Sequence, residues 1–298
     1  MPHQNLFHSA CWMEVLQEGL GAEILELKTE GSRPFPVPVF RKGPFRVLYP
    51  GFPVGDIPPE YCALLSTGDC FKRKGKPIHM TRIWQSHLLH SCRIIHDPAC
   101  FLYETVIEDL EAWSPERMSS SLRKNLKRAE KSGLHIEPLS VDDAPRLFRL
   151  YESTVNRHGG SLRYGENYFR SLATRSMDND LLDARVARTP EGKIAGVIVA
   201  AYHNGHAFYL HAVMDKTCRS MLPSDRLLFE AIGKAREAGM KSFSFLPSPI
   251  AQPGLIRFKE KWGGTTFRTP SHDLFAPSPT GASLRLALAL KRRLEARQ

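Results

Sequence analysis

Three apolar segments in the second half of the chain constrain the fold most strongly. Residues 182–188, 193–202 and 206–213 are rich in valine, isoleucine, leucine and alanine, and each has the length of a strand. The segments Thr189–Gly192 and His203–Gly205 separate them, and both have the composition of tight turns. The pattern therefore predicts an antiparallel meander of three strands.

Helices and further strands are predicted on both sides of this meander. Ser114 is a suitable cap, and Pro115 a suitable first residue, for a helix that ends near Gly133. The other predicted elements are, in chain order, strand 134–137, helices 141–157 and 166–174, and after the meander helix 224–238, strand 241–245, helix 255–261 and strand 265–269. This order predicts an α/β fold with a mixed sheet.

The N-terminal part of the chain also has the pattern of an α/β domain. The predicted elements are a helix at 12–20, strands at 24–27, 36–40, 44–49, 78–84 and 102–107, and a weak helix at 61–65. A chain of 298 residues is long enough for two domains. We expect an N-terminal half over residues 1–113, a catalytic half over 114–275 and a basic amphipathic tail over 276–298.

The charge of the chain favours anionic partners. The formal net charge is +10, and the basic residues gather in Phe71–Lys76, Arg117–Lys131 and Lys291–Arg293. Phosphates, nucleic acid and an anionic membrane surface all fit this charge, and a solvated surface fits it too. Because no apolar run is long enough to span a bilayer and the N-terminus does not read as a signal peptide, we expect a cytoplasmic protein, with a place at the inner face of the membrane as an option.

The cysteines and histidines do not predict a metal site. The six cysteines include no C-x-x-C pair, so thiols are expected rather than disulfides. One tract is dense in possible ligands, but their spacing matches no common zinc pattern; these residues are His87, His90, Cys92, His96 and Cys100.

Three motifs carry a resemblance to a known family. Leu122–Gly133 reads LRKNLKRAEKSG, Tyr151–Gly159 is followed by the aromatic pair Tyr168–Phe169, and Gly254–Gly263 reads GLIRFKEKWG. In this order and spacing they resemble the Fem/FemAB-like branch of the GNAT acyltransferase superfamily. The resemblance implies two tandem GNAT-like halves with a cleft between them. It also implies an N-acyltransferase that forms an amide on an amino acceptor in cell-envelope biosynthesis, with a peptidoglycan, polysaccharide or lipid-linked acceptor.

Lys259 is the first candidate for a catalytic residue. It lies between Phe258 and Trp262, which are candidates for substrate binding, and partial burial there would hold its ammonium against a carbonyl oxyanion. The resemblance implies the same position at the acyl-transfer site. The alternative is a lysine whose stem covers aromatic side chains.

A second group of candidates could accept a proton. His211 and Tyr209 are expected on the same face of their strand, and Asp215 follows that strand. His211 and Asp215 are therefore candidate catalytic residues and Tyr209 a candidate substrate-binding residue. A structural role is the alternative for the histidine.

Basic residues of the helix before Gly133 are candidates for substrate binding. Their helical spacing predicts a broad basic face that could meet a phosphate or an acidic acceptor, or simply water. Asn125 is unusual in mid-helix unless its amide has a hydrogen-bond partner. The candidates are Arg123, Lys124, Asn125, Lys127 and, from a later helix, Arg157.

Two segments depart from the family pattern. GNAT enzymes that use acyl-CoA carry a loop [QR]-x-x-G-x-[GA] that holds the pyrophosphate at a helix start. Here Arg219 and Ser224 remain as candidate cofactor-binding residues, but Leu222 replaces a glycine and Pro223 removes an N–H group. The acyl donor, acyl-CoA or aminoacyl-tRNA, is therefore left open, tRNA is a possible partner, and no tightly bound cofactor is expected.

The other departure lies before the lysine motif. Fem-like sequences commonly have an acidic residue and a glycine in that strand, whereas this chain reads FSFLP over Phe243–Pro247.

A second function class is a non-catalytic protein of this fold that binds an anionic membrane surface or nucleic acid. In residues 283–297, four leucines at alternate positions precede Lys291–Arg293, which predicts a basic amphipathic helix. Such a helix lies on lipid or docks on the protein, and the sequence leaves both open.

Overall fold

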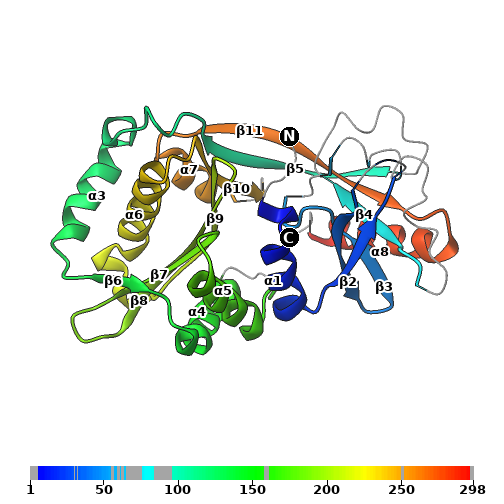
Figure 1. Ribbon diagram of the computed structural model, residues 1–298, viewed down its shortest axis with the longest axis horizontal. Coiled ribbons are helices and arrows are strands. Elements are labelled where there is room, and N and C mark those ends of the chain that lie inside the picture. Colours follow the sequence, from blue (N-terminus) through cyan, green and yellow to red (C-terminus); the bar gives the residue numbers. More distant parts are fainter. Residues whose placement is uncertain are drawn as a thin grey trace. The chain divides into compact units, whose positions relative to one another are not determined.

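The computed structural model divides into two compact units (Figure 1). Unit 1 comprises Met1–Gln17, Gly21–Leu102 and Arg268–Gln298, and unit 2 comprises Glu18–Leu20 and Tyr103–Phe267. This division differs from the expected ranges because the C-terminal segment belongs to unit 1. The structure describes residues 6–29, 31, 33–54, 57–58, 61, 64, 76–83, 96–157, 161–249 and 252–295, without the side chains of 96–100, 249 and 292–295.

A mixed sheet forms the centre of unit 2. Its strand order is β5-β10-β9-β8-β7-β6, and the first residues of β11 lie beside β5. Neighbours from β6 to β9 are antiparallel, while β9 and β10 are parallel. The predicted meander is therefore confirmed. The strands are β5 (His96–Ile107), β6 (His135–Pro138), β7 (Leu182–Arg188), β8 (Ile194–His203), β9 (His206–Met214), β10 (Ser242–Pro249) and β11 (Thr265–Phe275).

Helices cover both faces of this sheet (Figure 1). On one face, buried leucines of α3 and α6 join a core with Ile198 of β8 and Phe243 of β10. On the other face, α5 brings Tyr168 and Phe169 against His211 of β9. The helices are α3 (Ser120–Glu130), α4 (Ala144–Arg157), α5 (Glu166–Asp178), α6 (Pro223–Glu237) and α7 (Pro253–Glu260), with 3-10 turns at Pro115–Arg117, Val141–Asp143 and Lys216–Met221.

The helix predicted from Ser114 starts later than expected. Pro115–Arg117 forms only a 3-10 turn, and Met118 is extended, with ψ of 153°. Helix α3 begins after this extended residue, with Ser119 as its cap: the side chain of Ser119 accepts a hydrogen bond from the backbone N of Leu122 at 3.3 Å. Of the two serine caps in this segment, the second one begins α3.

A β-bulge in β9 corrects the expected orientation of two candidate residues. His211 lies opposite Val199, but Tyr209 lies opposite Ala200, the next residue of β8, so Leu210 is an extra residue in β9. Neighbouring residues of β8 point to opposite faces of the sheet. Tyr209 and His211 therefore lie on opposite faces, and the prediction that they share a face is wrong.

Unit 1 is a smaller α/β unit with the strand order β1-β2-β3-β4-β11. The predicted elements that lie among the described residues of this unit are observed to within a few residues, except that β5 begins at His96 rather than at 102 and that β11 extends beyond Thr269 and pairs antiparallel with β4. Its core contains Val37, Leu48, Ile78 and Leu274. The elements are α1 (Ala10–Leu20), β1 (Glu23–Leu27), β2 (Phe35–Lys42), β3 (Phe45–Leu48), β4 (Met80–Ile83), the second part of β11 and α8 (Pro279–Glu295).

Some sequence predictions fall outside the described residues. These are the basic segment at 71–75, most of the weak helix at 61–65, the tract from His87 to Cys92 and the side chains of His96 and Cys100. Among the helices that the structure describes, none is both long and apolar enough to cross a membrane.

Candidate active site

Lys259 lies in the interior of unit 2. Helix α7 begins with Pro253 in its first turn, and its lysine is only 4% exposed. The Nζ atom donates a hydrogen bond to the backbone O of Leu246 at 2.5 Å. Burial lowers the pKa of Lys259 to about 8, against the opposing effect of the negative charge of Glu104. The side chain is therefore a shielded ammonium near neutral pH.

The turn after α7 fixes the position of this helix. The backbone N of Ser119 donates to the O of Lys261 at 2.9 Å, which ties the turn to the start of α3. Gly263 has φ of +85°, and a Cβ atom there would lie 2.9 Å from the backbone O of Arg117. Only glycine fits this turn, which explains the last residue of the lysine motif.

Leu246, whose backbone O accepts the hydrogen bond from Lys259, has an unusual backbone conformation. Leu246 has φ of +55°, a left-handed conformation that costs a residue other than glycine about 1 kcal/mol. Its backbone N donates to Oγ of Ser244 at 3.0 Å, while its O accepts from Lys259. The ladder between β9 and β10 covers only Ser242–Ser244, so β10 leaves its parallel neighbour just before this residue.

Glu104 completes the cluster, and sequence analysis missed it. Its Oε1 atom accepts a hydrogen bond from Oγ of Ser244 at 2.5 Å. Burial raises the pKa of Glu104, and the bond from Ser244 and the charge of Lys259 oppose this rise. The only signal in the sequence is one carboxylate within the apolar strand Leu102–Ile107. An acid with a raised pKa beside a lysine with a lowered pKa is typical of functional sites.

His211 lies away from the core, against helix α5. Its Nε2 atom is 2.7 Å from the hydroxyl of Tyr168, and the ring of Tyr164 stacks on Tyr168 at 4.4 Å. Burial, together with the positive charge of Arg163, lowers the pKa of His211 to about 3. The ring is therefore neutral near neutral pH and a weak base, and its catalytic role stays a prediction.

Asp215 holds the segment that follows β9. Its Oδ1 accepts from the backbone N of Thr217 at 2.9 Å, and its Oδ2 pairs with Lys193 at 3.0 Å and with Arg146 at 3.2 Å. Burial would raise its pKa, but the bonds from Thr217 and Lys193 lower the pKa to about 2. These contacts give Asp215 a structural role in holding this segment, and its catalytic role stays a prediction.

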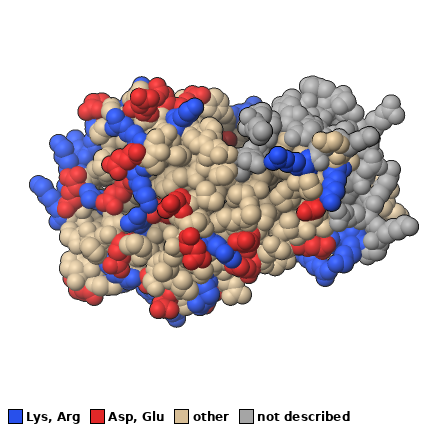
Figure 2. Space-filling model, in the orientation of Figure 1, with Lys and Arg blue, Asp and Glu red and all other residues tan. Residues whose placement is uncertain are grey.

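The basic residues of α3 lie on its outer side. Lys124 and Lys127 are exposed, and Arg123 donates to the backbone O of Glu116 at 3.1 Å. Figure 2 shows basic side chains near the end of the molecule where α3 lies, interspersed with acidic ones. Arg157 is exposed at the end of α4. These residues and the Lys259 cluster are not joined by any contact that we observe among the described residues.

Asn125 has the partner that its mid-helix position requires. Its Nδ2 atom donates to Oδ2 of Asp225 at 3.0 Å. Asp225 is only 9% exposed and lies in the first turn of α6, where burial raises its pKa. The amide therefore links α3 to α6.

The start of α6 is poorly suited to a pyrophosphate. Leu222 has φ of +58°, Pro223 is buried as the first helical residue, and the carboxyl of Asp225 already lies at the positive end of the helix dipole. Arg219 is exposed in the preceding 3-10 turn, and Ser224 is half-buried. Both remain candidates on sequence grounds alone.

The aromatic candidates belong to the core of unit 2. Trp262 is fully buried, and its backbone O accepts from Nε1 of Trp113 at 2.8 Å. Phe258 and Tyr209 are partly buried and pack against the same core. Core packing therefore accounts for these three side chains, and their contact with a substrate stays a prediction.

Comparisons with known proteins agree with this geometry. Residues 117–260 match the model of the acetyltransferase (GNAT) domain. No curated protein matches the chain. Among solved structures, FemX is 14% identical with a TM-score of 0.67, and the match covers 92% of this chain and 93% of that one.

Two further solved structures have a similar fold. One is the C-terminal domain of a putative lysylphosphatidylglycerol synthetase from Agrobacterium fabrum, with 16% identity, a TM-score of 0.58 and coverage of 95% and 92%. The other is L-PGS from Bacillus licheniformis, with 17% identity, a TM-score of 0.57 and coverage of 99% of both chains. The fold is therefore shared over nearly the whole length, and within it residues 117–260 match the model of the acetyltransferase (GNAT) domain.

Proposed function

We propose that the protein is an N-acyltransferase that forms an amide on an amino acceptor. The observation that carries the proposal is the buried Lys259 ammonium, held at the backbone O of Leu246 within the GNAT domain. Glu104 lies in the same cluster and supplies a carboxylate with a raised pKa. Together they provide a hydrogen-bond donor for an oxyanion and an acceptor for a proton.

The reaction follows from these two groups. The lone pair of the neutral acceptor amine attacks the carbonyl carbon of the donor, a C–N bond forms, and the negative charge moves to the carbonyl oxygen. Lys259 has three N–H donors, of which Leu246 takes one, so another is available to the oxyanion. Glu104 takes the proton from nitrogen and passes it to the leaving group as the bond between the acyl carbon and that group breaks. The products are the amide and a free thiol or hydroxyl.

The start of α6 favours aminoacyl-tRNA over acyl-CoA as the donor. A phosphate at this helix end would lie near the carboxyl of Asp225. It would also find one hydrogen-bond donor fewer, because Pro223 has no backbone N–H group. The net charge of +10 and the exposed lysines of α3 suit a polyanion such as tRNA. Acyl-CoA stays as the other donor to be tested.

We place the acceptor in cell-envelope biosynthesis, as a peptidoglycan precursor, a polysaccharide amine or a lipid-linked intermediate. Two of the proteins with a similar fold are a putative lysylphosphatidylglycerol synthetase domain and L-PGS, and this likeness supports an aminoacyl donor and an envelope acceptor. An enzyme with such substrates would act in the cytoplasm at the inner face of the membrane.

Labelled donors test the proposal. The purified protein is incubated with acetyl-CoA, longer acyl-CoAs or charged tRNA, each with an amine acceptor, and amide formation is followed. Lys259→Met should lower kcat by about 10²- to 10³-fold, the usual effect of losing an oxyanion donor. Lys241→Met, at an exposed lysine of the same unit, is the matched control. Equal rates in the wild type and the Lys259→Met variant would contradict the mechanism, and no amide formation from any of the donors would favour the non-catalytic alternative.

A further inference from the structure

Helix α8 is docked on unit 1 through one of its faces. Leu284 is 7% exposed and joins a core with Val47, Met80 and Phe275, and Leu288 packs against the same residues. This contact explains why the helix is part of the folded unit. The docked helix that the sequence allowed is therefore observed, and its outer face has to be considered separately.

The outer face of α8 exposes large apolar side chains. Leu286 is 63% exposed and Leu290 is 51% exposed. They are four residues apart, so they lie one above the other on the same side of the helix, and the exposed Ala282 continues this stripe one turn earlier. Two leucines that are more than half exposed on successive turns form an apolar surface that the docking of the helix leaves uncovered, which points to a binding role.

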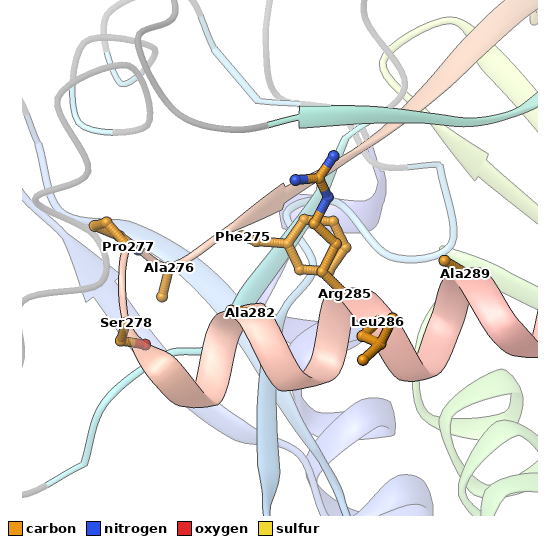
Figure 3. A pocket seen from close by; sticks show the side chains of 8 residues that line it. All are labelled: Phe275, Ala276, Pro277, Ser278, Ala282, Arg285, Leu286 and Ala289. Carbon is orange, nitrogen blue, oxygen red and sulfur yellow. The ribbon is translucent and has the colours of Figure 1, made fainter.

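A surface pocket borders this apolar stripe, and Ala282 and Leu286 of the stripe line it. Its volume is about 540 Å³, within the range of small-molecule sites. Figure 3 shows that the lining side chains come from α8, from the segment between β11 and α8, and from Phe275 at the end of β11. The lining residues are Phe275, Ala276, Pro277, Ser278, Ala282, Arg285, Leu286 and Ala289, all but two of them apolar.

Basic residues flank the apolar stripe. At 3.6 residues per turn, Arg285 lies about 100° to one side of Leu286. Lys291 is exposed and lies about 100° to the other side of Leu290, close to the direction of the buried Leu284 two turns earlier. The sequence continues with Arg292 and Arg293, and α8 has no acidic residue before Glu295. An apolar stripe between cations is complementary to a layer in which phosphates cover acyl chains.

We infer that the outer face of α8 binds the surface of a bilayer that contains anionic phospholipid. Leu286 and Leu290 enter the boundary between headgroups and acyl chains, Arg285 and Lys291 meet the phosphates, and the surface pocket accepts the apolar part of one lipid. The helix lies in the plane of the surface, because its inner face stays on unit 1. This binding site is independent of the proposed acyl transfer.

Vesicle sedimentation tests the inference without any substrate of the enzyme. The full chain is mixed with vesicles of phosphatidylcholine alone or of equal parts phosphatidylcholine and phosphatidylglycerol. We expect binding to the anionic vesicles only. The double variant Leu286→Gln/Leu290→Gln should lower the partition coefficient by at least about tenfold, because burial of a leucine side chain contributes about 1.5–3 kcal/mol when complete. Met177→Gln, at a methionine of α5 that is 66% exposed, is the matched apolar control.

Charge variants separate the helix from the overall charge of the protein. Arg285→Gln/Lys291→Gln should weaken binding by about thirtyfold, since each cation near an anionic surface contributes about 1 kcal/mol. Arg41→Gln/Lys42→Gln removes the same charge from an exposed part of β2 in unit 1 and should have a much smaller effect. Thermal unfolding of each variant checks that the fold is retained.

Three results would overturn the inference. One is the absence of binding to anionic vesicles. Another is an equal loss of binding in the α8 and β2 charge variants, with no loss in the leucine variant, which would mean that only net charge matters. The third combines two measurements on the leucine variant: its affinity for vesicles is unchanged, and gel filtration shows a monomer where the wild type is a dimer. This result would make the outer face of α8 an interface between copies of the chain.

Discussion

Replacement of Lys259 by methionine should change the pH dependence of stability in a defined direction. The ammonium is 4% exposed, and burial lowers its pKa from the ordinary 10.5 to about 8. At 1.36 kcal/mol per pKa unit, holding the charged form in the folded state costs about 3 kcal/mol. Methionine fills a similar volume without a charge and does not have this cost.

The direction follows from the protons bound by each state. Below pH of about 8, Lys259 is charged in both the folded and the unfolded state, so the wild type carries the full cost. Between about 8 and 10.5 the unfolded state holds a proton that the folded state has lost, so the free energy of unfolding rises with pH. Above 10.5 the lysine is neutral in both states, and the cost is absent.

Urea unfolding of both proteins at a series of pH values measures this effect. The wild type should gain about 3 kcal/mol relative to Lys259→Met as the pH rises from neutral to 10.5. At neutral pH the variant also leaves the O of Leu246 without its donor, which costs about 1–3 kcal/mol and offsets the relief. A stability difference that stays constant with pH, as expected for the exposed control Lys241→Met, would refute the assignment of Lys259 as a buried ammonium.

Other side chains of unit 2 give further expected outcomes. Glu104→Gln should lower kcat by about 10²-fold and move the alkaline limb of the pH–rate profile to lower pH, because the carboxylate supports the charged form of the lysine. Asn125→Ala should destabilise the protein by about 1–3 kcal/mol in urea unfolding, because the carboxyl of Asp225 loses its donor. Tyr168→Phe should cost about 1 kcal/mol, and NMR should show His211 neutral at every pH well above about 3.

Local sequence signals were sufficient for most of the fold. Strong turn sequences such as Thr189–Gly192 defined the meander, and long periodic segments defined the helices. The start of α3 was misplaced because Ser114 and Ser119 both have the chemistry of a cap, and only the extended Met118 between them separates the two. Strand β11 is longer than the predicted segment 265–269 because its pairing with β4, which is far away in the sequence, extends it to Phe275.

The candidate site was only partly predictable, for a related reason. Lys259 lies in a local motif, so the sequence was enough to select it. The bulge at Leu210 has no glycine or other local signal, and it became visible only when β9 was paired with β8. Glu104 was missed because its partner Ser244 is 140 residues away in the chain.

The departure of the FSFLP segment from the family pattern has a structural explanation. The resemblance leads us to expect an acidic residue and a glycine in β10. In this chain Leu246 adopts the positive φ that a glycine would favour, and its N and O atoms are both held by side chains of the cluster. The carboxylate comes instead from Glu104 on the neighbouring strand β5, through the hydroxyl of Ser244. An acid, a residue with positive φ and a buried lysine thus lie together in this chain although β10 itself has no acidic residue and no glycine, and this arrangement supplies the groups that the proposed acyl transfer needs.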